Sequence, residues 1–170
     1  LPRYGRLFRL FERRLHCFVC VSHAVGRSLR ALGIREESIV VIHNGIVDPA
    51  PARRVISAAR RNGSLEPARI GIVGQIGPWK GHEDLLEALG LLREWGLAFT
   101  LDVVGLGAER YTSELKRRVE QLGLSSDVRW RGFVRDREEI YGDLDICVVP
   151  SRSEEPFATT AFEPAFFGLP

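Results

Sequence analysis

Methionine is absent from this sequence of 170 residues, and cysteine occurs only three times. The chain begins at Leu1 and ends at Pro170, directly after an expected helix, so we expect it to be part of a longer protein. Strong charge of one sign is also missing, because the formal net charge is only +2 and no extended basic stripe is present. Domains that bind nucleic acid usually carry such features. The sequence therefore predicts no nucleic acid partner.

Long apolar runs are absent as well. The longest fall well short of the roughly 18 residues that a membrane-spanning helix needs, and no signal peptide with a cleavage site is visible. With 45% hydrophobic and 27% charged residues, the composition is typical of an ordinary globular chain with one full core. These features predict a cytoplasmic location.

Arginines alternate with leucine and phenylalanine at helical spacing over residues 6–14. The pattern predicts an amphipathic helix that packs its apolar face against another part of the protein. Peripheral contact with the inner face of a membrane is the alternative, because basic amphipathic helices also bind membrane surfaces.

The cysteines raise the question of a metal site, since His16, Cys17, Cys20 and His23 lie within eight positions. Residues 17–22 are mostly apolar and favour a strand, and positions three apart on a strand point to opposite faces. Haem attachment would need a histidine where Val21 stands. We therefore expect reduced structural thiols and no metal ligands, with metal or redox use as the alternative.

Strand-like and helix-like segments alternate along the chain. A first unit is expected from a strand at 17–21, a helix at 22–32 and a strand at 38–42. After a stretch rich in proline and arginine, a second run follows, with strands at 69–73, 99–104, 128–133 and 145–150 and helices at 84–95, 112–122 and 137–144. Such alternation predicts an α/β fold with a doubly wound parallel sheet. The strand at 128–133 reads as a half-covered edge strand, and the strand at 145–150 as a fully buried one.

The domain organisation follows from this pattern. Residues 1–49 are expected to end one Rossmann-like domain, 50–67 to form a linker, and 68–170 to form a second Rossmann-like domain that is truncated at its C-terminal end.

Unusual residues gather where the expected strands end. Gly74, Gln75 and Lys80 follow the strand at 69–73, and Gly105 and Gly107 follow the strand at 99–104. In parallel sheets ligands bind beyond the carboxyl ends of the strands, where glycines let backbone amides approach and a lysine can neutralise phosphate. The sequence thus predicts a phosphate site, although tight turns and a solvated lysine are the alternative. Neither a dinucleotide fingerprint nor a P-loop is present.

Two carboxylates, Glu155 and Glu163, lie eight residues apart across an expected strand-to-helix turn. This turn is where we expect the chemistry. The alternative for Glu155 is an exposed loop carboxylate. The alternative for Glu163 is a capping box with Thr160 at the start of a helix near Thr159 and Thr160.

Together these residues resemble the C-terminal half of a family 4 glycosyltransferase, with the end of its N-terminal domain. The landmarks are Val21-Ser22, Asn44-Gly45, Val73-Gly74-Gln75, Lys80-Gly81, Gly105-Leu106-Gly107, Gly132-Phe133-Val134, Pro150-Ser151, Glu155-Pro156-Phe157, Glu163 and Gly168-Leu169-Pro170. The resemblance covers most of the chain. It implies the GT-B fold and a retaining hexosyltransferase that takes a nucleotide-diphosphate sugar as donor and a sugar, lipid-linked or polysaccharide acceptor, with no cofactor and no metal.

The resemblance also implies roles for single residues. Glu155 and Lys80 would be catalytic, the first facing the donor sugar and the second neutralising the leaving diphosphate. Glu163 would bind the ribose hydroxyls, and the backbone around Val134 the base. The residues implied to bind the donor are Gly74, Gln75, Lys80, Val134, Phe157, Ala158, Thr159, Thr160 and Glu163. Amides at the start of the helix near Thr159 would add the positive end of a helix dipole.

The sequence departs from the family at three of these places. Gln75 stands where arginine is common, Ala158 where glycine is common, and Pro164 where alanine is usual. We expect the isolated chain to bind nucleotide without transferring sugar. A noncatalytic nucleotide-binding module and a nucleotide-sugar 2-epimerase of the same fold are the alternative functions.

Overall fold

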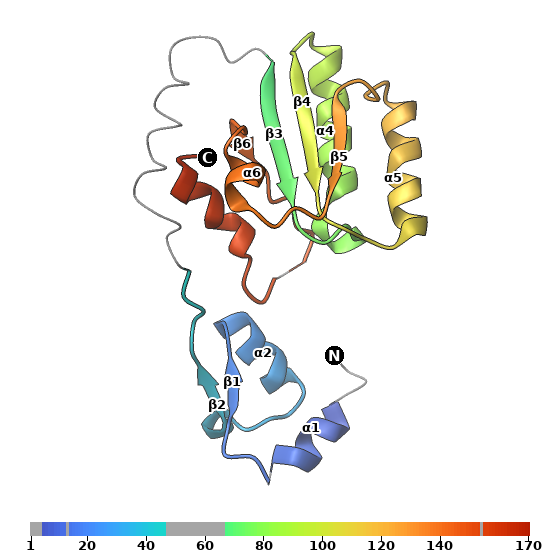
Figure 1. Cartoon of the computed structure of the whole chain (residues 1–170). Coiled ribbons are helices and arrows are strands. Elements are labelled where there is room, and N and C mark those ends of the chain that lie inside the picture. Colours follow the sequence, from blue (N-terminus) through green and yellow to red (C-terminus); the bar gives the residue numbers. More distant parts are fainter. Residues whose placement is uncertain (1–4, 13, 47–66, 154) are drawn as a thin grey trace. The chain divides into compact units, whose positions relative to one another are not determined.

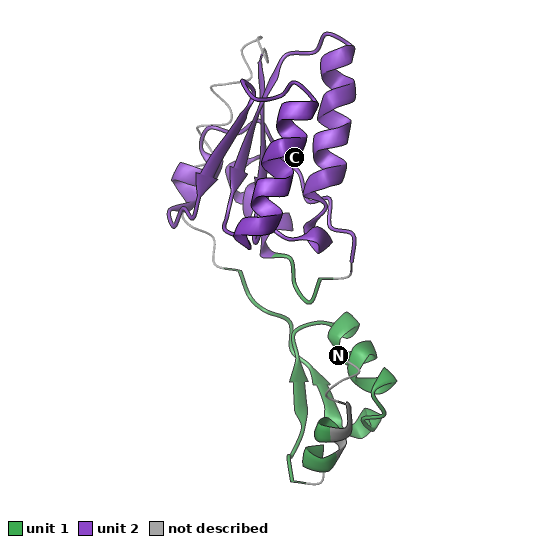
Figure 2. Ribbon diagram, turned by 90° about the vertical axis from the view of Figure 1, so that its right-hand side faces the viewer, with its two compact units in different colours: residues 1–47, 154–158 green, residues 48–153, 159–170 purple. Residues whose placement is uncertain are grey.

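The computed structural model describes residues 5–12, 14–46, 67–153 and 155–170. Figure 1 shows the elements in chain order. The chain divides into two compact units, one made of residues 1–47 and 154–158 and the other of residues 48–153 and 159–170 (Figure 2). The expected linker at 50–67 lies almost wholly outside the described residues. Within the described parts of the chain, no helix is both long and apolar enough to span a bilayer.

The first unit contains the β-α-β arrangement that the sequence predicts. Strand β1 (Phe18–Cys20) pairs in parallel with β2 (Ile39–Val41), and helix α2 (His23–Ala31) connects them through a 3-10 turn, η2 (Glu36–Ser38). Ser22 caps α2, because its hydroxyl accepts a hydrogen bond from the backbone N–H of Val25 at 3.3 Å. Cys20 lies buried in the small core of this unit, and burial raises the pKa of its thiol. That cysteine is therefore a structural one.

The amphipathic segment forms helix α1 (Gly5–Glu12), as expected. Leu7, Leu10 and Phe11 are exposed on it. Cys17 is exposed, whereas Cys20 is buried. Among the described residues, no group of three or more His, Cys, Asp and Glu side chains could hold a metal.

The second unit is a four-stranded parallel sheet with the order β5-β4-β3-β6. Its strands are β3 (Ala68–Val73), β4 (Phe99–Val104), β5 (Val128–Gly132) and β6 (Ile146–Cys147). Its helices are α4 (His82–Glu94), α5 (Glu109–Gln121) and α6 (Arg137–Tyr141), with 3-10 turns η4 (Pro78–Lys80), η5 (Thr159–Ala161) and η6 (Glu163–Phe167). The alternating α/β pattern of the sequence is confirmed, with element ends shifted by a few residues.

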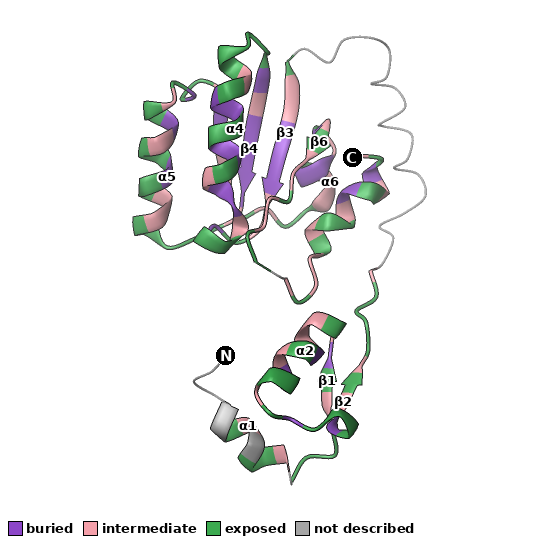
Figure 3. Ribbon diagram, turned by 180° about the vertical axis from the view of Figure 1, so that it is seen from behind, coloured by how far each residue is buried: buried purple, intermediate pink, exposed green. Residues whose placement is uncertain are grey.

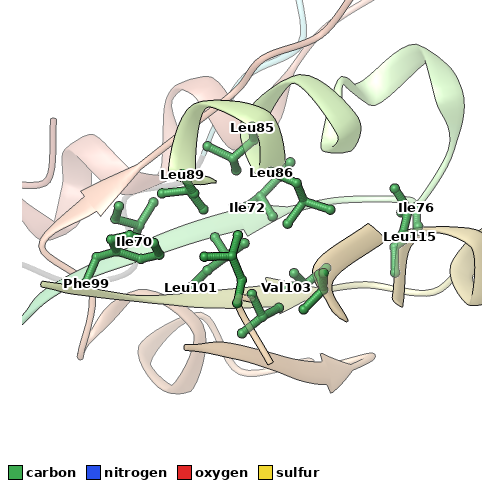
Figure 4. Packing of buried hydrophobic residues seen from close by; sticks show 13 residues of the cluster. Ile70, Ile72, Ile76, Leu85, Leu86, Leu89, Phe99, Leu101, Val103 and Leu115 are labelled. Carbon is green, nitrogen blue, oxygen red and sulfur yellow. The ribbon is translucent and has the colours of Figure 1, made fainter. Parts of the chain in front are cut away.

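Side chains alternate between the two faces of the sheet and so define two layers. Ile70, Ile72, Leu101 and Val103 point to the face that α4 and α5 cover, where leucines from both helices complete one core (Figure 4). The most buried of these leucines are Leu86, Leu89 and Leu115. Figure 3 shows the buried stripe of α4 facing the strands, while its outer face is exposed. This face provides most of the hydrophobic stabilisation of the unit.

The opposite face of the sheet carries a second, smaller cluster. Val104 packs there with Ile140, Tyr141 and Leu144 from the α6 region, and with Phe167 from η6. Helices therefore cover both faces of one parallel sheet, which is the doubly wound arrangement. The cluster on this face also forms the apolar base of the site described below.

Strand β5 is the edge strand that the sequence predicts, but the prediction of a fully buried strand at 145–150 is wrong. Only Ile146–Cys147 forms a strand, and Ile146 and Val149 are exposed. Strand β6 pairs with β3 on one side, whereas on its other side the backbone N–H of Cys147 donates to the carbonyl of Pro170 at 3.0 Å.

His82, the first residue of α4, is buried with an exposed fraction of 3%. Burial lowers the pKa of His82, and the positive charge of Lys80 adds to this, while the backbone of Gly77 opposes them only in part. The folded chain therefore keeps this imidazole neutral at a pH where the unfolded chain binds a proton.

This difference predicts a loss of stability in mild acid. As the pH falls below about 6.5, the unfolded state gains a proton at His82 that the folded state does not, so the free energy of unfolding decreases by up to about 1.4 kcal/mol per pH unit. Urea unfolding at pH 7.5 and 5.0 measures the decrease, which His82→Gln should reduce. The matched control is His23→Gln, a change at an exposed histidine. An equal pH dependence in wild type and His82→Gln would contradict the prediction.

Candidate functional site

The carboxyl ends of β3 and β4 are held together beyond the strands by backbone contacts. Gly74 N–H donates to Val104 C=O at 2.9 Å, and Ile76 N–H donates to Leu106 C=O at 2.9 Å. Gly105 has a φ of 143°, and a Cβ built on it would lie 1.8 Å from the carbonyl oxygen of Gly74. Only glycine fits at this position. The predicted Gly-x-Gly turn thus brings two loops together at the sheet edge.

A pocket of about 440 Å³ opens at this edge of the sheet. It is lined by Val73, Gly74, Gln75, Val104, Gly105, Leu106, Phe133, Val134 and Ile140. Three residues that the sequence assigned to the donor, Gly74, Gln75 and Val134, therefore come together here. Gln75 contributes the one polar side chain among these lining residues. The remaining surface is apolar or backbone, which suits a flat ring held by main-chain groups.

Lys80 lies next to this pocket although it does not line it. The Nζ atom of Lys80 is 3.5 Å from the position that a Cβ on Gly74 would occupy. The ammonium group therefore lies close to the end of β3, where a phosphate beside the pocket would gain from its charge. This places Lys80 and Gly74 together, as the sequence predicted.

Arg152 connects the turn that carries Lys80 to the segment after β6. Its backbone N–H donates to Trp79 C=O at 2.9 Å. Its guanidinium donates two hydrogen bonds of 2.6 Å to Asp84 and one of 2.9 Å to Glu83, in the first turn of α4. These bonds hold the pKa of Asp84 below its usual range. Bidentate pairing of this kind fixes geometry as well as charge.

Sequence reasoning missed this role of Arg152. The signals were an arginine directly after Pro150-Ser151 and an acidic pair, Glu83 and Asp84, at a helix start. Nothing in the sequence relates Arg152 to this acidic pair, because Arg152 lies 68 positions after Asp84.

Glu163 is held by two side chains from α6. The hydroxyl of Tyr141 donates to Glu163 Oε2 at 2.9 Å, and the guanidinium of Arg137 lies 3.2 Å from Oε1. Burial, together with the negative charge of Glu163, raises the pKa of Tyr141 and raises the pKa of Cys147 to about 11. The capping-box interpretation of Glu163 with Thr160 is wrong, because η6 has no side-chain cap and begins after Phe162.

The helix expected to start near Thr159 and Thr160 is also corrected by the structure. The chain forms two short 3-10 segments there, η5 and η6, and Pro164 stands in the first turn of η6. Proline has no N–H to donate, and two single turns align few peptide dipoles. The expected helix dipole at this place is therefore lacking. The Thr160 hydroxyl is buried without a hydrogen-bond partner among the described residues.

Three predicted site residues lie in the other unit. Glu155, Phe157 and Ala158 group with residues 1–47, whereas the pocket-lining residues belong to the second unit. The residues that it does bring together are Gly74, Gln75, Lys80 and Val134.

The comparisons with known proteins decide the family. Residues 57–170 match the family model described as glycosyl transferases group 1, which is more than half of the chain. The chain belongs to this family. Residues 1–48 match a second model, described as glycosyltransferase family 4.

Solved structures agree with this assignment. HepE from Anabaena, in complex with UDP and glucose, superposes with a TM-score of 0.84 at 26% identity, over 100% of this chain and 47% of HepE. The C-terminal domain of LpcC from Francisella tularensis superposes with a TM-score of 0.55 at 29% identity, over 74% of this chain and 68% of that one. The Rossmann-like α/β fold expected for half of a GT-B glycosyltransferase is thereby confirmed.

The curated relatives include a synthase and a putative glycosyltransferase. Mannosylfructose-phosphate synthase from Agrobacterium fabrum is 33% identical over 58% of this chain and 23% of its own length. The putative colanic acid biosynthesis glycosyltransferase WcaL from Escherichia coli is 27% identical over 88% of this chain and 35% of its own length. The chain thus spans about a quarter to a third of these curated relatives.

The contact between the Gly74 and Gly105 loops gives a testable prediction. Gly105→Ala should lower the free energy of unfolding by about 3 kcal/mol or more, because backbone strain alone costs about 1–3 kcal/mol and the new Cβ must displace a carbonyl. The matched control is Gly123→Ala, which also has a positive φ, 67°, but has no neighbour within 4 Å of its Cβ position. It should lose only about 1–2 kcal/mol. Equal losses in chemical denaturation would contradict the prediction.

Proposed function

We propose that this chain is the donor-binding part of a retaining family 4 hexosyltransferase that uses a nucleotide-diphosphate sugar. The observation that carries the proposal is the pocket at the carboxyl ends of β3, β4 and β5, with Lys80 beside Gly74. HepE, solved with UDP and with UDP-glucose, supports UDP as the first nucleotide to test. The acceptor proposed is a sugar, a lipid-linked sugar or a polysaccharide.

The chemistry of donor cleavage fits the residues present. Breaking the bond between the anomeric carbon and the diphosphate builds negative charge on the leaving group and positive charge on the sugar. Lys80 would neutralise the diphosphate as a point charge, and the carboxylate of Glu155 would face the sugar and favour its oxocarbenium character. Phe157, Ala158, Thr159 and Thr160 would complete the donor contacts. We propose that no metal takes part.

The nucleoside would be held by the rest of the site. The apolar surface between Leu106 and Phe133 suits the faces of a base, and the main chain of Val134 would bind its edge. Glu163 would accept hydrogen bonds from the ribose hydroxyls, since a carboxylate offers about four lone-pair sites and the two contacts described above leave others open.

Gln75 favours a second function. A neutral amide lines the pocket where the resemblance leads us to expect arginine, so the diphosphate meets one permanent charge fewer. A noncatalytic nucleotide-binding module would tolerate this loss better than a transferase. Sugar transfer by the protein that contains this chain, lost on Glu155→Ala, would favour the enzyme.

Calorimetric titration with UDP, GDP and ADP tests the proposed binding. One nucleotide should bind, and Lys80→Ala should weaken it by about 10-fold or more, because hydrogen bonds to charged groups contribute about 1.5–3 kcal/mol. Arg110→Ala is the matched control, since it removes an equal charge from an exposed position of α5. No binding of any of the three nucleotides by the folded chain would contradict the proposal.

A further inference from the structure

Tyr141 contacts Glu163, the carboxylate proposed to bind the ribose, although no sequence motif indicates this contact. It ends α6, is 1% exposed, and its ring packs against Phe167 with centroids 5.3 Å apart. A fully buried tyrosine needs a partner for its hydroxyl, and here that partner is Glu163 Oε2 at 2.9 Å. Packing fixes the ring and therefore the position of the hydroxyl.

Arg137 lies four residues before Tyr141 on the same helix. Residues at this spacing share a helix face, so both side chains reach the same partner. Arg137 is 3.2 Å from Oε1, whereas Tyr141 bonds Oε2. Each carboxylate oxygen is thus held by a different residue, and two such contacts fix the plane of the carboxylate.

The carboxylate of Glu163 can still accept hydrogen bonds from a ligand. Its two described contacts leave about two of four lone-pair sites open, and the side chain is 14% exposed. A ribose presents two adjacent hydroxyls, which can donate to both oxygens of one carboxylate when its plane is fixed. A carboxylate that is free to rotate would lose rotamer entropy on binding.

We propose that Tyr141 and Arg137 are positioning residues for ribose recognition, which hold Glu163 so that its open lone pairs meet the 2′- and 3′-hydroxyls of the donor nucleotide. The inference rests on the proposed function and adds to it two residues that no motif of the sequence indicates. Tyr141 and Arg137 act through Glu163 and need not touch the nucleotide.

The test compares two ligands on each variant. Calorimetry measures the affinities for UDP and for 2′,3′-dideoxy-UDP, and their ratio reports the contribution of the ribose hydroxyls. Wild type should prefer UDP by about 10-fold or more, as expected for hydrogen bonds to a charged group. Tyr141→Phe should weaken UDP several-fold and leave the dideoxy ligand within about twofold, so the ratio falls. Glu163→Gln should lower the ratio further.

A structural role alone would weaken both ligands equally and leave the ratio unchanged, and that result would overturn the inference. Tyr111→Phe is the matched control, because Tyr111 packs against the core under α4 and α5, whereas Tyr141 belongs to the cluster on the opposite face of the sheet. If Tyr141→Phe does not fold, Arg137→Gln carries the same test at a partly exposed position.

The possible results distinguish a failure of the proposed nucleotide binding from a failure of the proposed role of Tyr141 and Arg137. Absence of binding by UDP, GDP and ADP would overturn both. If GDP or ADP binds instead of UDP, the same pair of ribo and dideoxy ligands is used with that base. Binding without a preference for the ribo form in wild type would overturn the inference alone.

Discussion

The approach of Gly105 to the carbonyl of Gly74 is the contact on which the site depends. It allows the loops after β3 and β4 to continue side by side beyond the sheet, with hydrogen bonds from Gly74 to Val104 and from Ile76 to Leu106. Any side chain at Gly105 would push these loops apart. Both glycines line the pocket, and Lys80 lies beside Gly74, so the pocket depends on this close approach of the two backbone segments.

The two faces of the sheet differ in the size of their apolar clusters and in the residues that they contribute to the candidate site. The face under α4 and α5 holds the larger core. Arg152 links the start of α4 to the turn that carries Lys80, because it bonds both Asp84 and the carbonyl of Trp79. The face under α6 holds fewer apolar residues, but it provides Ile140 and Val134 to the pocket and Tyr141 to Glu163. The larger core lies on one face, and residues of the candidate site lie on the other.

Much of this could be predicted from the sequence, because it depends on local patterns. The apolar runs predict the strands. The glycines after Val73 and Val104 predict that two loops with little side-chain bulk meet at the sheet edge, where the pocket lies. The contacts of Arg152 and Tyr141 could not be predicted, since they join residues 68 and 22 positions apart whose pairing leaves no trace in spacing. The helix expected after Thr159 is replaced by two short 3-10 segments, and Pro164 in the second of them has no N–H to donate.

The central claim is that a nucleoside diphosphate binds across the ends of β3, β4 and β5. Amide chemical-shift mapping of the labelled chain during titration with UDP tests it most directly. We expect the largest shifts at Gly74, Gly105 and Val134, with smaller shifts on the outer faces of α4 and α5. Shifts confined to α4 and α5, or spread evenly over the chain, would contradict it.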